Sequence, residues 1–521
     1  MSTKLRWLAA FALLMLLPLV RVASTYRVFS ATADEPVHIA SGYDWITRGV
    51  YVFDPEHPPL ARGLFGLGLR AGGVVSPPPE NWQTLQPTWL AAARGMDLLW
   101  HNGEYVRNLA NARRGNLVFL LLALITIAAW AWRAFGPGVA LLAVALFGTL
   151  PPVLAHAGLA TTDMAVAATL PLALFALERW LEQPTLRRAL YLGIAIGLGL
   201  VSKLSFGLFF AIGAMVMIVF MRMSRPRVRH LLAIGALAVL VVWTCYCFDL
   251  RTFFVGLQWA KAHADRGNIA FFLGDRSDRG WWYYFPVVVA LKTPIPFLLL
   301  FFFGAVKLIR THFVWIPVAL LISVMPVSLN IGVRHVLALY PMMAIVAAFG
   351  VRELSPLPFG ERARVRGASY ARFAPHPDPL PGGERGLFRA GVLIVLLAWQ
   401  LIGTSLAHPD YLPWFNEAAG RHPERLLGDS NLDWGQDMLR LSEVAREEKI
   451  PHLSFFLFGP AGFDRVPLPP HQPLAPGVPT QGWVAVSETA LQIAKPGDFA
   501  WLTAHRPVRR VGKSIRLYYI E

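Results

Sequence analysis

The recurrence of apolar runs close to 20 residues long constrains this chain more than any other feature. A helix needs about 20 apolar residues to cross the hydrocarbon core of a bilayer, so each run is predicted to be a membrane span. The composition agrees, because only 15% of the 521 residues are charged, whereas soluble globular proteins carry about 25%. We therefore predict an all-α polytopic membrane protein.

About eleven spans are predicted, with boundaries accurate to a few residues. If the N-terminus is cytoplasmic, the arginine-rich short connections all lie on the cytoplasmic side, as the positive-inside rule requires. An odd number of spans then places the C-terminal tail outside. The spans are residues 7–29, 116–132, 139–155, 164–181, 189–202, 204–221, 231–250, 285–309, 314–330, 336–350 and 390–407.

The spans divide the chain into two predicted domains. Residues 1–407 form the membrane domain, in which residues 30–114 are an extracytoplasmic loop with helices lying at the membrane interface. Residues 352–388 are rich in proline, glycine and arginine, so they are expected to form a flexible cytoplasmic insertion. Residues 408–521 combine one helical pattern with strand-like runs, which predicts a small extracytoplasmic α/β domain.

The net charge of +16 does not indicate a nucleic-acid partner. Most of the lysines and arginines lie in short connections between spans, where membrane topology accounts for them. The two cysteines, Cys245 and Cys247, are too close in sequence for a typical disulfide and too few for a zinc site. Membrane lipids are the partners that the composition itself supports.

Ionisable residues at the predicted outer ends of the spans are the candidate site residues, because charges near a membrane are usually functional. Carboxylates that face several cations suit a site that handles a phosphate and a hydroxyl. The candidates are Asp34, Glu35, Glu56, His57, Asp163, Lys203, Lys292, Arg334 and His335.

Each candidate also has a structural explanation. Asp34 or Glu35 would cap a helix that starts at Pro36, and Asp163 would cap the fourth span. The cations would extend to lipid headgroups. His38 lies one helical turn after Asp34, a spacing that permits shared metal ligation.

One apparent motif fails. The segment Asp429-Ser-Asn431-Leu-Asp433 begins like a calcium loop. Trp434 occupies the position that requires glycine, however, and Arg440 occupies the position of the bidentate acid. No phosphate-binding loop, zinc-protease helix or nucleophile elbow is found in the sequence.

Taken in order, the outer residues are similar to the pattern of the GT-C glycosyltransferases. Over about residues 1–350 the chain resembles family 39, which includes dolichyl-phosphate-mannose protein mannosyltransferases and bacterial aminoarabinose transferases. The tail resembles the outer domain of some bacterial members. The matching motifs are Asp34-Glu35, Glu56-His57-Pro58-Pro59, Thr162-Asp163, Arg334-His335, Gly428–Asp437 and Gly482-Trp-Val-Ala-Val.

The resemblance implies a polytopic enzyme of the bacterial cytoplasmic membrane that works on its outer face. It would move a sugar from a polyprenyl-phosphate donor to a protein, lipid or glycan acceptor. The resemblance assigns catalytic roles to Asp34, Glu35 and Asp163. Asp34, His38 and Asp163 are the candidate ligands of a divalent metal. Contacts with the lipid phosphate are expected from His57, Lys203, Lys292, Arg334 and His335.

The residue types suit this chemistry. An acceptor hydroxyl becomes a good nucleophile when a carboxylate such as Asp34 removes its proton. The lipid phosphate leaves readily and needs cations rather than an acid. A single displacement would invert the anomeric centre. A membrane transporter and a non-catalytic binder of lipid-linked sugars are the alternatives, although no matched internal repeat of the kind typical of transporters is found.

Overall fold

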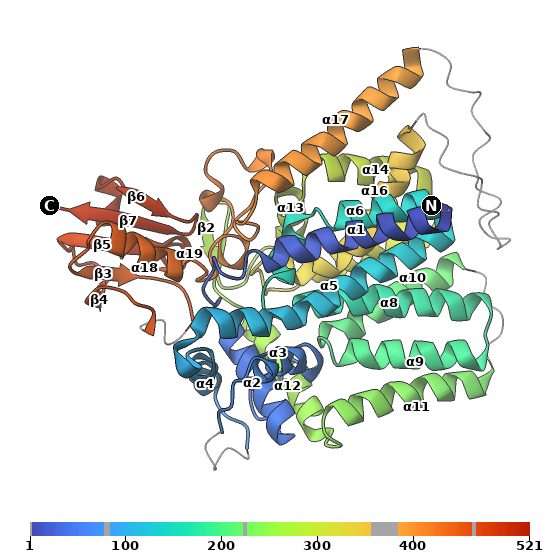
Figure 1. Cartoon of the computed structure of the whole chain (residues 1–521), viewed down its shortest axis with the longest axis horizontal. Coiled ribbons are helices and arrows are strands. Elements are labelled where there is room, and N and C mark those ends of the chain that lie inside the picture. Colours follow the sequence, from blue (N-terminus) through green and yellow to red (C-terminus); the bar gives the residue numbers. More distant parts are fainter. Residues whose placement is uncertain (1–2, 78–83, 222–226, 356–383, 461–464) are drawn as a thin grey trace.

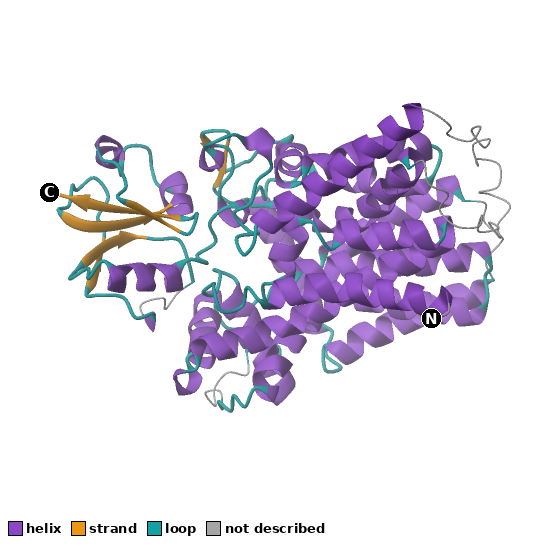
Figure 2. Cartoon of the chain, turned by 45° about the horizontal axis from the view of Figure 1, so that its top comes forward, coloured by secondary structure: helices purple, strands orange, loops and turns teal. Residues whose placement is uncertain are grey.

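A computed structural model describes residues 3–77, 84–221, 227–355, 384–460 and 465–521. In it a large bundle of helices carries a smaller C-terminal domain built on a sheet (Figure 1). The five-stranded sheet lies at the end of the molecule opposite to the N-terminus (Figure 2). The predicted insertion, residues 352–388, lies largely outside the described residues.

Six helical segments of the described chain are long and apolar enough to cross a membrane, and the number rises to eight if each of two bent helix pairs is one span. The bent pairs are α6 (Pro137–Phe147) with α7 (Pro151–Ala157), and α13 (Tyr284–Lys292) with α14 (Ile295–Leu308). The six are α1 (Thr3–Ala23), α5 (Tyr105–Phe135), α8 (Asp163–Glu182), α11 (Val228–Cys245), α16 (Tyr340–Leu354) with the preceding 3-10 helix η2 (Val333–Leu339), and α17 (Glu384–Leu406).

The prediction of eleven spans is therefore confirmed only in part. Every predicted run contains a helix, but α9 (Leu186–Leu200), α10 (Ser205–Phe220) and α15 (His312–Val324) have 13 to 16 residues. At about 1.5 Å per residue, such helices are shorter than the roughly 30 Å of a hydrocarbon core. Hydropathy marks apolar runs correctly, but it does not show where a helix starts and stops.

Four amphipathic helices lie at the end of the bundle that carries the sheet domain (Figure 1). Three come from the predicted loop, residues 30–114, and α12 comes from a later connection. Close packing fixes their crossings: a Cβ on Gly42 would lie 1.7 Å from the carbonyl oxygen of Arg62. The four are α2 (Glu35–Arg48), α3 (Pro59–Ala71), α4 (Thr88–Leu99) and α12 (Arg251–Arg266).

The C-terminal domain is a mixed five-stranded sheet in the order β4-β3-β5-β7-β6. The strand β3 is parallel to β4 and β5, whereas β7 is antiparallel to β5 and β6. Alternating side chains bury Leu453 and Leu517 on one face, and Val484 and Tyr518 on the other. The elements are α18 (Met438–Glu447), β3 (Leu453–Phe456), β4 (His471–Pro473), β5 (Gly482–Ser487), α19 (Glu488–Ile493), β6 (Arg509–Val511) and β7 (Ile515–Ile520).

Candidate active site

A cavity of about 790 Å³ lies between the amphipathic helices and the bundle. Its walls come from the start of α2, the turn before α3, the connection after α9, α12 and η2. We call it the site cavity. It brings together seven residues singled out from the sequence: Asp34, His38, Glu56, His57, Lys203, Arg334 and His335.

Asp34 is in direct contact with a cation across the cavity. Its Oδ2 lies 2.7 Å from Nη1 of Arg334, and its side chain is 35% exposed. Asp34 holds the N-cap position of α2, with Pro36 behind it, but its side chain makes no capping hydrogen bond. The carboxylate is therefore directed to the cavity and is not used to end the helix.

Asp163 and Lys203 form a second ion pair. Lys203 Nζ lies 2.5 Å from Asp163 Oδ1, and the aspartate side chain is only 2% exposed. Lys203 lines the cavity and Asp163, the first residue of α8, lies behind it. The aspartate thus orients the ammonium group toward the cavity.

Glu35 is turned away from the cavity. Its Oε1 and Oε2 each accept a hydrogen bond of 2.8 Å from the guanidinium of Arg113, which is fully buried on α5. The backbone amides of Thr32 and Ala160 also donate to this carboxylate, each at 2.8 Å. The hydroxyl of Thr32 is a fifth donor, at 3.2 Å, and Glu35 thus joins the start of α2 to α5 and to the turn before α8.

Lys292 is also absent from the cavity wall. At the end of α13 its buried ammonium donates to the carbonyl oxygens of Leu412, Trp414 and Asn431. The distances to Leu412 and Asn431 are 2.8 and 2.7 Å. These carbonyls belong to the chain that leads into the C-terminal domain. The structure therefore places Lys292 at a tether between the bundle and the tail, and not beside Asp34.

His38, a predicted metal ligand, has a protein partner. Its Nδ1 lies 2.9 Å from Nε of Arg62, a buried guanidinium that also pairs with Asp54. Burial and the nearby Arg62 hold the pKa of His38 well below its ordinary value, so the ring is neutral. Although burial acts to raise the pKa of Asp54, Arg62 and His57 hold it well below its ordinary range.

The described residues contain one group whose ligand atoms all lie within 4.8 Å of one another: Asp54, Glu56 and His57. The predicted set of Asp34, His38 and Asp163 does not form such a group. On the same side of the cavity, Nδ1 of His263 lies 3.2 Å from Glu56, a hydrogen bond that raises the pKa of the histidine. Carboxylate and imidazole donors suit a transition metal, so Asp54, Glu56 and His57 fit one better than the predicted set does.

Sequence reasoning missed two elements of the site. The helix α12 brings His263 to the cavity wall, and its Gly256 packs so closely on the turn before α3 that a Cβ would lie 2.2 Å from the carbonyl oxygen of Pro55. Trp434 lies beneath Arg334, with the guanidinium carbon 4.3 Å from the ring centroid. The sequence did contain a signal for Trp434. It lies in the polar motif Gly428–Asp437, and the failed match to a calcium loop leaves those polar residues in need of another role.

The comparisons with known proteins agree with the expected resemblance. Residues 106–246 match a family model described as dolichyl-phosphate-mannose-protein mannosyltransferase. The structure is similar to that of ArnT from Cupriavidus metallidurans in the apo state, with a TM-score of 0.51 and 14% identity over 99% of this chain and 98% of that one.

A second structure of ArnT from the same organism, bound to undecaprenyl phosphate, gives the same TM-score of 0.51 and 14% identity over 97% of both chains. No protein of curated function matches the sequence significantly. The family resemblance is thus confirmed over residues 106–246, and the ArnT fold extends along nearly the whole chain.

Proposed function

We propose that this protein is an inverting glycosyltransferase that moves a sugar from a polyprenyl-phosphate donor to an acceptor hydroxyl on the outer face of a bacterial cytoplasmic membrane. The observation that carries the proposal is the site cavity, where the partly exposed carboxylate of Asp34 lies with the cations Lys203 and Arg334. A base and a phosphate-binding group at one membrane surface are what such a transfer needs.

Asp34 is the general base in this proposal. It removes the proton from the acceptor hydroxyl as the oxygen attacks the anomeric carbon, and the bond from that carbon to the lipid phosphate breaks. Negative charge beside the anomeric carbon also stabilises an oxocarbenium-like transition state. The ion pair with Arg334 fixes the direction of the carboxylate.

Lys203, Arg334 and His335 receive the departing phosphate. Nε of Arg334 and Nε2 of His335 are buried and lack hydrogen-bond partners within the described parts of the chain. Such atoms are costly, and phosphate oxygens would give the guanidinium the acceptors that it lacks. Asp163 acts through Lys203, whose ammonium it positions. His57, which lines the same cavity, lies close enough to a bound substrate to contact it.

The comparisons support the donor class. The ArnT structure that covers 97% of this chain was solved with undecaprenyl phosphate, and the matched family is described by its dolichyl-phosphate-mannose donor. Both molecules contain a polyprenyl phosphate, which is the carrier part of the proposed donor. A divalent metal at Asp54, Glu56 and His57 would add positive charge to the cavity when bound.

The test is release of free polyprenyl phosphate from labelled lipid-linked sugars by the purified full-length protein. We expect release by the wild type and its loss in Asp34→Asn. Asp97→Asn is the matched control, because Asp97 is 51% exposed and pairs with Arg465 away from the cavity. Release that persists in Asp34→Asn would show that Asp34 is not the base. Uptake of a solute by reconstituted protein without release would favour a transporter.

A further inference from the structure

We propose that the segment Gly428–Asp437 is a working part of the active site and that Trp434 is a positioning residue that holds Arg334 against Asp34. This inference rests on the proposed function, because it concerns the same ion pair. It also gives the C-terminal domain a definite role, since that domain holds the segment in place. Contacts at both ends of the ion pair, and contacts made by the segment itself, support this role.

The segment contacts the backbone next to both members of the pair. The carbonyl oxygen of Trp434 accepts a 2.9 Å hydrogen bond from the amide of Ala33, which directly precedes Asp34. The side chain of Asn431 accepts a 3.0 Å hydrogen bond from the amide of Val333, which directly precedes Arg334. One short segment therefore sets the positions of the carboxylate and of the guanidinium together.

The ring of Trp434 determines how the guanidinium lies. It is buried, with 1% of its surface exposed, and the guanidinium carbon of Arg334 is 4.3 Å from its centroid. An arginine has several rotatable bonds, and stacking on an aromatic face restricts the plane of its charged group. The restricted plane leaves Nη1 directed at Asp34.

The C-terminal domain holds the segment from the other side. Asp433 accepts hydrogen bonds through Oδ2 from the amide of Thr489, at 2.9 Å, and through its carbonyl from the hydroxyl of Thr489, at 2.8 Å. Ser514, just before β7, donates to Asp437 at 2.7 Å. Folding of the sheet domain therefore orders the segment that carries Trp434.

The approach of the segment to η2 is too close for most residues. Gly332 has φ of +149°, and a Cβ there would lie 2.2 Å from Oγ of Ser430. On the other flank Ser30 donates to the carbonyl oxygen of Gly435 at 3.0 Å and accepts from the amide of Met438 at 3.1 Å. The segment is thus held between the chain before α2 and the chain before Arg334.

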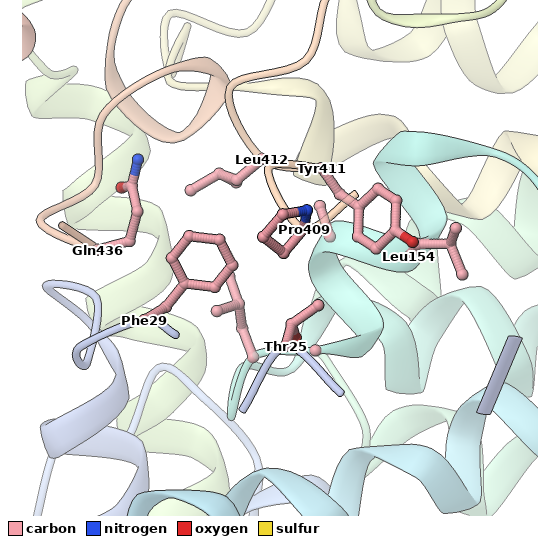
Figure 3. Close-up of a pocket in the computed structure, with 10 residues that line it drawn as sticks. Thr25, Phe29, Leu154, Pro409, Tyr411, Leu412 and Gln436 are labelled. Atoms are coloured by element: carbon pink, nitrogen blue, oxygen red, sulfur yellow. The ribbon is translucent and has the colours of Figure 1, made fainter. Parts of the chain in front are cut away.

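The junction is closely packed on the side of α1 and α7. Where the end of α1, the helix α7 and the tail meet, a cavity of only about 20 Å³ remains, with Phe29, Leu154, Tyr411 and Gln436 in its wall (Figure 3). Such a volume holds about one water molecule. The tail is therefore seated on the bundle and is not merely tethered to it, so a change in the segment is transmitted to the ion pair.

The alternative is that Trp434 is an ordinary core residue whose loss only destabilises the protein. A double-mutant cycle distinguishes the two. We would measure kcat and KM for donor cleavage in Trp434→Leu, Arg334→Gln and the double variant, with Trp434→Phe as the conservative replacement. Trp180→Leu removes a buried tryptophan from the far end of α8 and serves as the control for lost packing.

If Trp434 acts through Arg334, we expect Trp434→Leu to lower kcat by about 10- to 100-fold, and Trp434→Phe to recover most of it because a ring face remains. The double variant should be no slower than Arg334→Gln alone. Additive effects, or a Trp434→Leu variant that is folded by size-exclusion chromatography and has normal kcat, would overturn the inference.

Failure of this inference is distinguishable from failure of the proposed function. If Asp34→Asn abolishes release and Trp434→Leu does not affect it, only the positioning role is lost. If Asp34→Asn still releases polyprenyl phosphate, the proposed base is wrong whatever the cycle shows. Should Trp434→Leu fail to fold, Trp434→Phe combined with Arg334→Lys gives a second cycle with smaller changes.

Discussion

Nη1 of Arg334 lies 2.7 Å from Oδ2 of Asp34, although 300 positions separate the two residues in the chain. The contact joins the start of α2, which follows the first predicted span, to η2, which begins a late one. The exposed carboxylate and the largely buried guanidinium have different environments, with 35% and 10% of their side chains exposed. That asymmetry leaves the carboxylate open to an acceptor while the cation stays fixed.

We expect Arg334→Gln to lower kcat/KM for the donor by about 100-fold, because a charge-assisted hydrogen bond to phosphate and one to Asp34 are lost together. Arg334→Lys keeps the charge but loses the planar fork and the stacking on Trp434, so its activity should fall between those of Arg334→Gln and the wild type. Initial rates of polyprenyl phosphate release check this order. Equal activity of the lysine variant and the wild type would show that charge alone matters.

Glu35→Gln should mainly affect stability. Removing one partner of the buried pair with Arg113 leaves an uncompensated charge, which costs about 3–5 kcal/mol. Thermal unfolding of the detergent-solubilised protein measures the loss, and Glu35→Gln combined with Arg113→Met should recover part of it. If Glu35→Gln has normal thermal stability but turns over as slowly as Asp34→Asn, Glu35 instead takes part in catalysis.

Lys292→Met should loosen the tail from the bundle. The change leaves three buried carbonyl oxygens without their shared donor, and each costs about 1–3 kcal/mol. We expect faster limited proteolysis between residues 408 and 437, and a lower Tm. Lys307→Met is the control, because Lys307 is exposed and lies near the C-terminal end of α14. Unchanged proteolysis in Lys292→Met would contradict the tether.

The C-terminal domain should lose stability as the pH rises. Burial raises the pKa of Asp433 to about 7, from an ordinary value of 3.8. The folded state therefore holds a proton that the unfolded chain releases, and its stabilising effect is lost as the pH rises through about 7. Between pH 5 and pH 8 this amounts to about 2–3 kcal/mol.

Thermal unfolding at several pH values tests this prediction. We expect the Tm of the wild type to fall between pH 5 and pH 8, and the Tm of Asp433→Asn to change much less. Asp97→Asn should follow the wild type. An identical pH dependence in Asp433→Asn and the wild type would show that another group is responsible.

A divalent metal should bind through Asp54, Glu56 and His57. The proton shared between His263 and Glu56 must leave for a metal to bind, so affinity should increase with pH. Calorimetric titration of the chelator-treated protein with Zn²⁺ measures this affinity. We expect a decrease of tenfold or more in His57→Gln, which removes a ligand, and little change in Asp163→Asn. A larger decrease in the affinity of Asp163→Asn would instead support Asp34, His38 and Asp163 as the ligands.

Much of the general architecture could be predicted from the sequence. Apolar runs of about 20 residues predict a polytopic membrane protein because the thickness of a bilayer sets helix length. The tail was correctly predicted to contain a small α/β domain, and its strands at 453–456, 482–487 and 515–520 lie in the strand-like runs of the sequence. Seven candidate site residues share one cavity because each lies at the same end of its helix or connection.

Tertiary structure alone decided which of these residues face one another. Asp34 and Glu35 are adjacent and both acidic, yet one lines the cavity and the other is surrounded by Arg113, Thr32 and Ala160. Lys292 contacts the tail, and Trp434 supports an arginine 100 positions away. Composition and periodicity describe the structure of residues that are near one another in the chain. Contacts between residues so far apart depend on close packing, which leaves no pattern in the local sequence.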